Sequence, residues 1–191
     1  MTGVTHDGQR WSNADQDRVD LVDYDAAWPA MFQAEAARIR AAIGAWGPFD
    51  LEHVGSTAIP GLEAKPIIDI MLISADRERW PSLVEPIQRL GYVFWAGNPR
   101  RDRMFFVKGM PPFGERRTHH VHVRTPGDAG AALLFRDHLR GHPDDLGRYA
   151  SLKRELAATH ATDRDAYTDG KARFVEEIVR KATATSGRSE S

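Results

Sequence analysis

The sequence contains no cysteine, no long apolar run and no sizeable net charge. Without cysteine the chain has no disulfide, no thiolate nucleophile and no cysteine-ligated zinc, which fits a reducing compartment. No apolar run approaches the roughly 20 residues of a membrane-spanning helix, and the polar start of the chain has no apolar signal-peptide segment. We therefore expect a cytoplasmic protein without a membrane partner.

The charge balance also limits the partners. The chain has 26 Lys and Arg against 27 Asp and Glu, a formal net charge of -1. This balance gives no general attraction to nucleic acid or anionic lipid, so we expect no general nucleic-acid binding and only local basic surface. The 191 residues suffice for one domain with a core. The sequence predicts this domain at residues 18–181, between polar, disordered tails at residues 1–17 and 182–191.

Apolar periodicity predicts alternating helices and strands. Helical spacing of Trp28, Phe32, Ile39 and Ile43 after a cap at Asp25 indicates the first helix. Strands are expected at 49–54, 66–73, 92–96, 104–108 and 118–124, and further helices at 80–90, 134–140, 143–159 and 165–181. A mixed sheet of four to five strands with flanking helices and a C-terminal helical segment is an α/β or α+β layer fold.

One carboxylate, Asp69, interrupts the apolar strand at 66–73. An ionised carboxylate is costly to bury unless it is paired, hydrogen-bonded or bound to a metal. The turn before this strand carries Gly55, Ser56 and Thr57, whose amides and hydroxyls suit phosphate oxygens, and Asp69 could hold Mg²⁺ or Mn²⁺ on those phosphates. The alternative is a turn glycine followed by an aspartate that accepts hydrogen bonds from neighbouring amides.

The motif HHVHV offers additional metal ligands. In an extended strand His120 and His122 project from one face, about 6.5 to 7 Å apart, whereas His119 faces the other way. With Asp69 they would form a set of two histidines and one carboxylate, which suits a transition metal such as Zn²⁺ more than Mg²⁺. The alternative is that these histidines form hydrogen bonds within a half-buried sheet or contact phosphate without a metal.

Five further residues are candidates for the same site. His53 precedes the Gly-Ser turn and could act as a base or orient a substrate, and Lys65 at the strand entrance could neutralise phosphate. Arg101 and Arg103 carry guanidinium groups that suit phosphate or carboxylate. Lys171 lies on an apolar helical stripe, where it either extends to water or is paired within the site. For His53 the alternative is a hydrogen-bonded strand end, and for the others it is a solvated charge.

Several segments resemble the GrpB family. They are HVGSTAIPGLEAKPIIDI, HHVHV, FRDHLRGHPDDLGRYASLKRELA and the spacing of Tyr167, Lys171 and Phe174, and the likeness runs from about Val22 to Val179. The resemblance implies the polymerase-β-like fold of the nucleotidyltransferase superfamily, in which a Gly-Ser turn precedes a strand with an Asp-x-Asp or Asp-x-Glu pair. This sequence departs from that pattern, because Met71 stands at the second carboxylate position.

The resemblance and the residues together favour a protein that binds a nucleotide or another phosphorylated small molecule. Asp69, Ser56 and His53 would be the catalytic residues if a divalent metal supports nucleotidyl transfer to a small acceptor. The missing carboxylate favours an alternative, a non-catalytic binding or accessory module with a protein partner. GrpB-like domains are fused behind dephospho-CoA kinase in some actinobacteria, which fits that alternative. A third hypothesis is a metal-dependent hydrolase that uses Asp69, His120 and His122.

Overall fold

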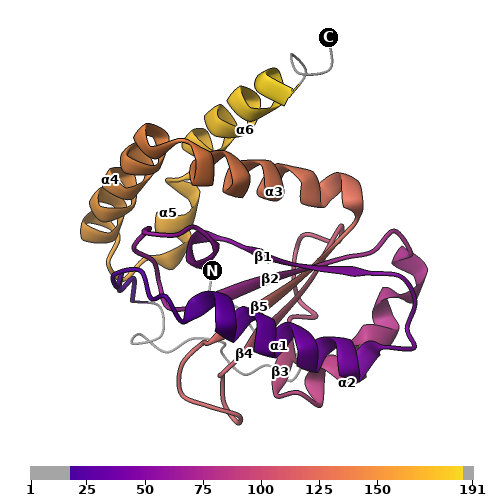
Figure 1. Ribbon diagram of the computed structural model, residues 1–191. Coiled ribbons are helices and arrows are strands. Elements are labelled where there is room, and N and C mark those ends of the chain that lie inside the picture. The colour runs from indigo at the N-terminus through magenta and orange to yellow at the C-terminus, as the bar shows by residue number, and fades with distance from the viewer. Residues whose placement is uncertain (1–17, 187–191) are drawn as a thin grey trace.

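Five strands form one mixed sheet in the spatial order β1-β2-β5-β4-β3 (Figure 1). A computed structural model describes residues 18–186, so the expected tail at residues 1–17 lies outside the described residues. β2 and β5 pair in parallel at the centre, and the other neighbouring strands pair antiparallel. The strands are β1 (Asp50–Val54), β2 (Ile68–Ile73), β3 (Tyr92–Phe94), β4 (Met104–Lys108) and β5 (His119–Arg124). The expected mixed α/β fold is confirmed.

One face of the sheet is covered by α1 (Trp28–Ile43), the 3₁₀ helix η2 (Arg77–Leu83) and α2 (Val84–Gln88). Alternate side chains of β2 point into this layer, because successive residues of a strand face opposite sides. The sequence predicted one helix over residues 80–90. Pro81 and Pro86 lack the amide hydrogen that a continuous α-helix needs, and the regular α-helical part is only five residues long. The core on this face includes Phe32, Ile39, Ile68, Ile70, Leu72, Leu83, Ile87, Phe106 and Val121.

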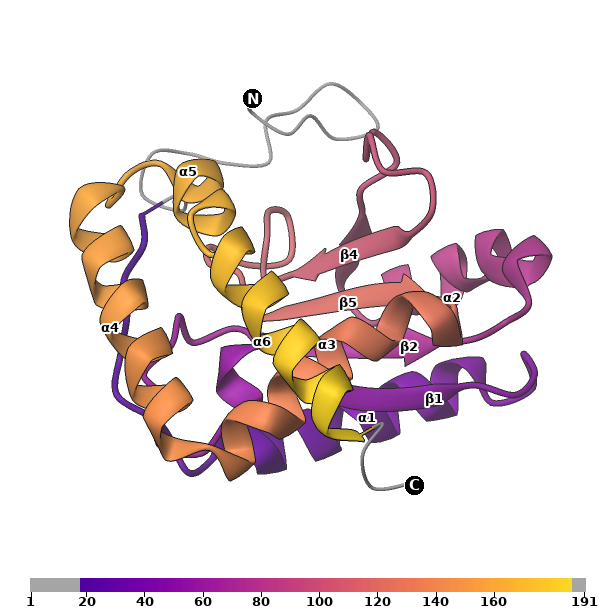
Figure 2. The ribbon, with the colours of Figure 1, turned by 90° about the horizontal axis from the view of Figure 1, so that it is seen from above.

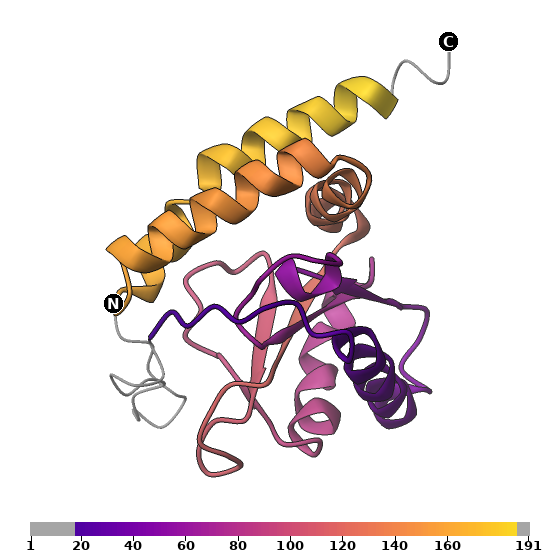
Figure 3. The same cartoon turned by 60° about the vertical axis from the view of Figure 1, so that its left-hand side comes forward.

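The opposite face is partly covered by the C-terminal helices. These are α3 (Pro126–Gly141), α4 (Pro143–Thr159), α5 (Arg164–Asp169) and α6 (Ala172–Ser186). Residues Ala129, Ala132 and Leu133 of α3 pack on the sheet against Val54, Met71 and Ile73. Figure 3 shows α4 and α6 side by side above the sheet, and the ring of Tyr149 on α4 stacks on that of Phe174 on α6 at 5.2 Å.

Two helix boundaries differ from the prediction in this part of the chain. α3 begins at Pro126 rather than at residue 134, because the Thr125 hydroxyl accepts a hydrogen bond from the Asp128 amide and caps the helix. The predicted helix at residues 165–181 is divided into α5 and α6 next to Gly170, whose backbone leaves no room for a side chain beside Leu156.

The C-terminal limit of the domain also needs correction. The sequence predicted disorder from residue 182, yet α6 continues to Ser186 and Ala182 is buried. The segment after Lys181 is rich in small and polar residues, and this composition gave no sign that Ala182 would be buried. Residues 187–191 lie outside the described residues.

Charged side chains join the C-terminal helices to one another. Asp145 of α4 is buried, and its Oδ2 atom accepts hydrogen bonds from Nε2 of His138 on α3 at 2.7 Å and from Nζ of Lys181 on α6 at 2.6 Å. Arg148 donates to the other oxygen of the same carboxylate at 3.1 Å. One buried carboxylate therefore connects three helices.

Between residues 18 and 186, no helix combines the length and the apolar character needed to cross a membrane.

Candidate functional site

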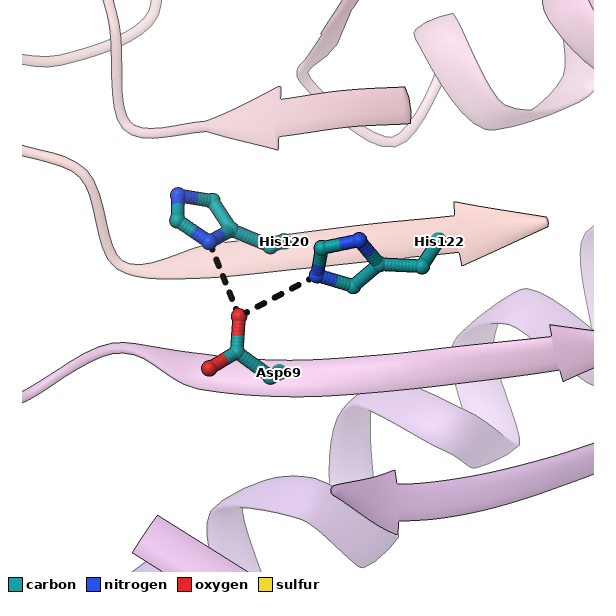
Figure 4. Close-up of side chains that lie close together, drawn as sticks. All are labelled: Asp69, His120 and His122. Atoms are coloured by element: carbon teal, nitrogen blue, oxygen red, sulfur yellow. Dashed lines mark hydrogen bonds and ion pairs between the residues drawn. The ribbon is translucent and has the colours of Figure 1, made fainter. Parts of the chain in front are cut away.

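Asp69, His120 and His122 converge at the centre of the sheet (Figure 4). β2 and β5 are parallel neighbours with Asp69 opposite His120 and Met71 opposite His122, so all three candidate ligands lie on the face that carries α3. The Oδ1 atom of Asp69 lies 2.9 Å from Nδ1 of His120 and 3.3 Å from Nε2 of His122. One potential ligand atom from each residue lies within 4.8 Å of the other two.

The protonation of this cluster follows from burial and hydrogen bonding. Burial lowers the pKa of His120 to about 4, although the hydrogen bond and the charge of Asp69 raise it, so the imidazole is neutral at pH 7. Burial raises the pKa of Asp69, but the hydrogen bonds from His120 and His122 outweigh it and hold this pKa well below its usual range. The cluster therefore combines an ionised carboxylate with a neutral buried imidazole.

The second ring nitrogen of His120 is unsatisfied. The His120 side chain is 7% exposed, and its Nε2 atom has no hydrogen-bond partner among the described residues. We assign the proton to Nδ1, because this nitrogen faces the ionised carboxylate and a neutral imidazole has only one N–H. A buried polar atom without a hydrogen-bond partner is costly inside a protein, so the packing of the fold does not by itself explain why a histidine stands at position 120.

Gly55 borders the cluster at the end of β1. Its φ of 72° and ψ of -172° lie in a region that only glycine readily adopts. A Cβ atom at this position would overlap Oδ2 of Asp69. The Gly-Ser turn thus lies against the carboxylate, as the sequence predicted, and the absence of a side chain makes room for Asp69 itself. The next residue, Ser56, lies near Tyr149 of α4: burial raises the pKa of Tyr149 to about 12, although the Ser56 hydroxyl lowers it.

Two lysines lie near the cluster, over the ring of Tyr167. The Nζ atoms of Lys65 and Lys171 lie 5.1 and 4.2 Å from the centroid of the Tyr167 ring. Burial lowers the pKa of Lys65 to about 6 and that of Lys171 to about 8, while the charge of Asp69 raises both. No carboxylate of the described residues forms an ion pair with Lys65 or Lys171, and the contact that Lys171 makes is a cation–π contact with Tyr167.

Sequence reasoning missed a third lysine. Lys153 of α4 is 1% exposed, and its ammonium group donates a hydrogen bond to the backbone carbonyl of Glu63. Burial lowers the pKa of Lys153 to about 7. The signal was its place on the helical stripe of Leu146, Tyr149 and Leu156, which marks the position as facing the interior.

His53 and Thr57 lie at the turn but do not face the cluster. His53 stands on the opposite face of the sheet, where its ring stacks on Phe32 of α1 at 4.8 Å. The Thr57 hydroxyl donates to the carbonyl of Ile67 at 3.2 Å, so it accepts at 3.0 Å from Nε2 of His53. Burial lowers the pKa of His53 to about 4, which keeps the ring neutral. This geometry favours the hydrogen-bonded alternative for His53 over a catalytic base.

Arg101 and Arg103 lie away from the cluster. Arg101 is exposed and donates to the carbonyl of Ala96 at 3.1 Å. Arg103 binds its neighbour Asp102, with Nη2 at 2.6 Å from the carboxylate. Asp102 also lies 3.9 Å from Arg124 at the last residue of β5, whereas His120 lies near the first. Because β4 runs antiparallel to β5, residues that precede β4 come next to the end of β5.

Neither Met71 nor the residue opposite it on β1 offers a free carboxylate to replace the one missing from the expected pair. Met71 is buried under α3. The carboxylate directly opposite on β1 is Glu52, which lies on the same face. Glu52 accepts a hydrogen bond from Arg136 of α3 at 2.7 Å and so is already paired.

Comparisons with known proteins agree on one family. The family model described as GrpB protein matches residues 18–181. The chain is 56% identical over 178 residues to the UPF0157 protein PA4798 of Pseudomonas aeruginosa, covering 93% of this chain and 73% of that one. It is similar to the crystal structure of the conserved protein GrpB from Enterococcus faecalis, with a TM-score of 0.76 and 31% identity, over 87% of this chain and 98% of that one.

A longer relative has a named activity. The chain is 32% identical over 187 residues to a protein named dephospho-CoA kinase in Mycolicibacterium paratuberculosis. The match covers 86% of this chain but only 46% of that protein.

Proposed function

We propose that this chain, which belongs to the GrpB protein family, binds a divalent transition metal through Asp69, His120 and His122 and, with it, a phosphorylated small molecule such as a nucleotide. The observation that carries the proposal is the convergence of one ionised carboxylate and two imidazoles on a single point.

The spacing of the three ligand atoms fits such a metal. Zinc binds imidazole nitrogen and carboxylate oxygen at about 2.0 to 2.2 Å, which places tetrahedral ligand atoms about 3.3 to 3.5 Å apart. The observed separations of 2.9 and 3.3 Å need only a small outward movement of His120 to reach this geometry. A neutral His120 would also offer the metal a lone pair on Nδ1 at pH 7, in the tautomer whose single proton has moved to Nε2.

The donor set favours one transition metal over a pair of magnesium ions. Two imidazoles and one carboxylate suit Zn²⁺, Mn²⁺ or Fe²⁺, whereas two bridging magnesium ions require several carboxylates. Met71 is apolar, and Glu52 is bound to Arg136, so the cluster of potential metal ligands among the described residues contains one carboxylate. A bound metal would supply positive charge to phosphate oxygens.

The lysines complete the proposed phosphate site. Lys65 and Lys171 are partly buried, lack a paired carboxylate among the described residues and lie close enough to Asp69 for its charge to act on both. The Lys171 ammonium group would bind phosphate oxygens, and the charge of an incoming phosphate would favour protonation of Lys65, so both would stabilise the charge that develops during transfer. The Ser56 hydroxyl would orient the phosphate beside the Gly55 backbone. Nucleotidyl transfer to a small acceptor is the reaction class that this arrangement supports first.

A second candidate function is an accessory module that binds the ligand without turnover. The match to less than half of a dephospho-CoA kinase supports it, because the region similar to this chain is one part of that longer protein. The missing carboxylate at Met71 supports it as well. Ligand binding without consumption of ATP distinguishes this candidate from an enzyme.

Titration calorimetry of Zn²⁺ and Mn²⁺, and then of ATP with and without each metal, tests the proposal. We expect one metal per chain and ATP binding that depends on the metal in the wild-type protein. Asp69→Asn should abolish both effects and keep the fold. Asp50→Asn serves as the matched control, because Asp50 is exposed at the first residue of β1. Identical isotherms for the wild-type and Asp69→Asn proteins would refute the metal site.

A further inference from the structure

Arg124 shares a sheet face with the Asp69 cluster. His120, His122 and Arg124 are alternate residues of β5, so their side chains project from the same face. Successive positions on that face are about 6.5 to 7 Å apart, which places Arg124 one such step beyond His122. The ring of Phe105 on β4 lies opposite His122, with 4.9 Å between the ring centroids.

The Arg124 guanidinium is largely buried and poorly satisfied. Its side chain is 16% exposed, and its Nε atom is buried without a hydrogen-bond partner among the described residues. Its ion-pair contact, from Nη1 to Asp102, is 3.9 Å long, which exceeds the range of a hydrogen bond. A buried guanidinium without an acceptor is costly, so this position favours an incoming anion.

The carboxylates near Arg124 are already engaged. Asp102 accepts three contacts from Arg103, the shortest at 2.6 Å. Asp128 accepts a hydrogen bond from the Thr125 hydroxyl at 2.6 Å. Arg103 and Arg124 therefore share one fully bonded carboxylate and leave an excess of positive charge at this end of β5.

Several side chains on this part of the sheet face are partly exposed. In Figure 2, which looks onto the face covered by α3 and α6, none of the helices between residues 18 and 186 is drawn over β4. Phe105, Trp95 and His122 on this part of the face are all partly exposed. The Phe105 and Trp95 rings lie edge to face at 6.1 Å between centroids, and such partly exposed rings suit stacking by a base or another planar group.

We infer that Arg124, supported by Arg103, forms a second anion-binding position for the ligand of the Asp69 cluster. The ligand would then carry two anionic groups, one on either side of a ring within the ligand. This inference rests on the proposed function. It identifies the substrate class as a nucleotide-like molecule with a phosphate or carboxylate in addition to the group bound at the cluster.

Two adenosine phosphates test the ligand class. Adenosine 5′-monophosphate offers one anionic group, and adenosine 3′,5′-bisphosphate offers two across one ribose. Calorimetry in the presence of Zn²⁺ or Mn²⁺ should show the bisphosphate binding about tenfold or more tightly to the wild-type protein, because hydrogen bonds to charged groups are strong. Arg124→Met should reduce this ratio to near one and leave the monophosphate affinity unchanged.

Further variants separate charge from geometry. Arg124→Lys keeps the charge but not the guanidinium fork, so it should retain part of the bisphosphate preference. Arg101→Met is the matched control, since Arg101 is exposed and donates only to the Ala96 carbonyl in the described residues. This variant should keep the full preference. Melting curves of all three variants establish that they are folded.

A crystal soaked in sodium tungstate gives a measurement that does not depend on a metal at Asp69. An anomalous peak beside Nε of Arg124 in the wild-type protein, absent in Arg124→Met, would support the anion position even if neither nucleotide binds and the proposed function fails. Equal affinity of the wild-type protein for the two nucleotides would overturn the inference while the metal site stands. Failure of both nucleotides and of tungstate at Arg124 would overturn both proposals.

Discussion

The carboxylate of Asp69 lies where a side chain at position 55 would otherwise be, so Gly55 and Asp69 fit together only because Gly55 has no side chain. The backbone of Gly55 turns at a φ of 72°, and the Oδ2 atom of Asp69 fills the position that a Cβ would take. The other oxygen, Oδ1, contacts both histidines. The glycine of the Gly-Ser turn therefore sets the orientation of the carboxylate.

Gly55→Ala should disturb the cluster and the fold together. This backbone conformation costs a non-glycine residue about 1 to 3 kcal/mol, and displacement of the Asp69 carboxylate adds to this. We expect a lower free energy of unfolding in urea and loss of Zn²⁺ binding in a chelator competition assay. Gly61→Ala is the control, because Gly61 also has a positive φ, of 77°, and a Cβ there would meet no atom within 4 Å. If Gly55→Ala binds Zn²⁺ like Gly61→Ala, the glycine does not orient Asp69.

His122→Ala should lower the affinity for Zn²⁺ by more than about 100-fold, because loss of a direct ligand exceeds the 10- to 100-fold effect of losing a supporting residue. His119→Ala offers a control within the same HHVHV motif. Its ring contacts the Thr118 hydroxyl at 3.0 Å and is not part of the cluster. Competition with a chromophoric chelator measures both affinities, and equal losses in the two variants would contradict the assignment.

Lys171→Met should stabilise the ligand-free protein at pH 7 by on the order of 1 kcal/mol, after allowance for solvent screening. Burial lowers the pKa of Lys171 from 10.5 to about 8. Below about pH 8 the buried charge destabilises the fold fully, and between pH 8 and 10.5 the free energy of unfolding rises because only the unfolded chain retains the proton. Urea unfolding at pH 7 and pH 10 should show this rise in the wild-type protein and less of it in the variant.

Lys108→Met provides the contrasting case. Lys108 pairs at 2.7 Å with Glu35, which is 4% exposed, so the variant leaves a buried carboxylate without its strongest partner. Because Arg38 still contacts Glu35 at 3.2 Å, we expect a loss of free energy of unfolding in the same urea experiment that stays below about 3 to 5 kcal/mol, the cost of an unpaired buried charge. Equal effects of the two lysine variants would mean that carboxylate pairing does not distinguish these positions.

Asp145→Asn should loosen α6 and remove part of the acid sensitivity of the fold. The hydrogen bond from His138, followed by that from Lys181, holds the pKa of Asp145 well below its usual range. Its stabilising contribution is therefore complete above about pH 4 and is lost as the pH falls further. Hydrogen exchange should show faster exchange in α6 of the variant at pH 7. Asp144→Asn, at the exposed neighbouring position, should exchange like the wild-type protein.

Local patterning predicted the central part of the candidate site. Alternation within HHVHV placed His120 and His122 on one face, and the apolar run around Asp69 indicated a buried strand. The structure brings these three residues together as predicted. Their ligation of a metal stays a prediction.

The positions of the other candidate residues depend on how distant strands pair, which the sequence did not predict. The sequence does not specify that β4 runs antiparallel beside β5, and this direction moves Arg103 to the far end of the site. It also does not give the register of β1 on β2, which turns His53 toward α1. The sequence showed Lys153 only as one residue of an amphipathic helix. It did not show that the backbone at Glu63 lies next to the ammonium group and accepts its hydrogen bond.

The parallel pairing of β2 and β5 has a consequence for the order of assembly. The hydrogen bond between His120 and Asp69 joins residues 51 positions apart, and β3 and β4 lie between them in the chain. Such a non-local contact must overcome its loop-closure entropy before it contributes, so it forms slowly compared with local helices and hairpins. A nascent chain that has emerged from the ribosome only up to the end of β4 does not yet contain His120 and His122 outside the ribosome. Zinc uptake would then report that synthesis has passed β5 and that the central pairing has closed.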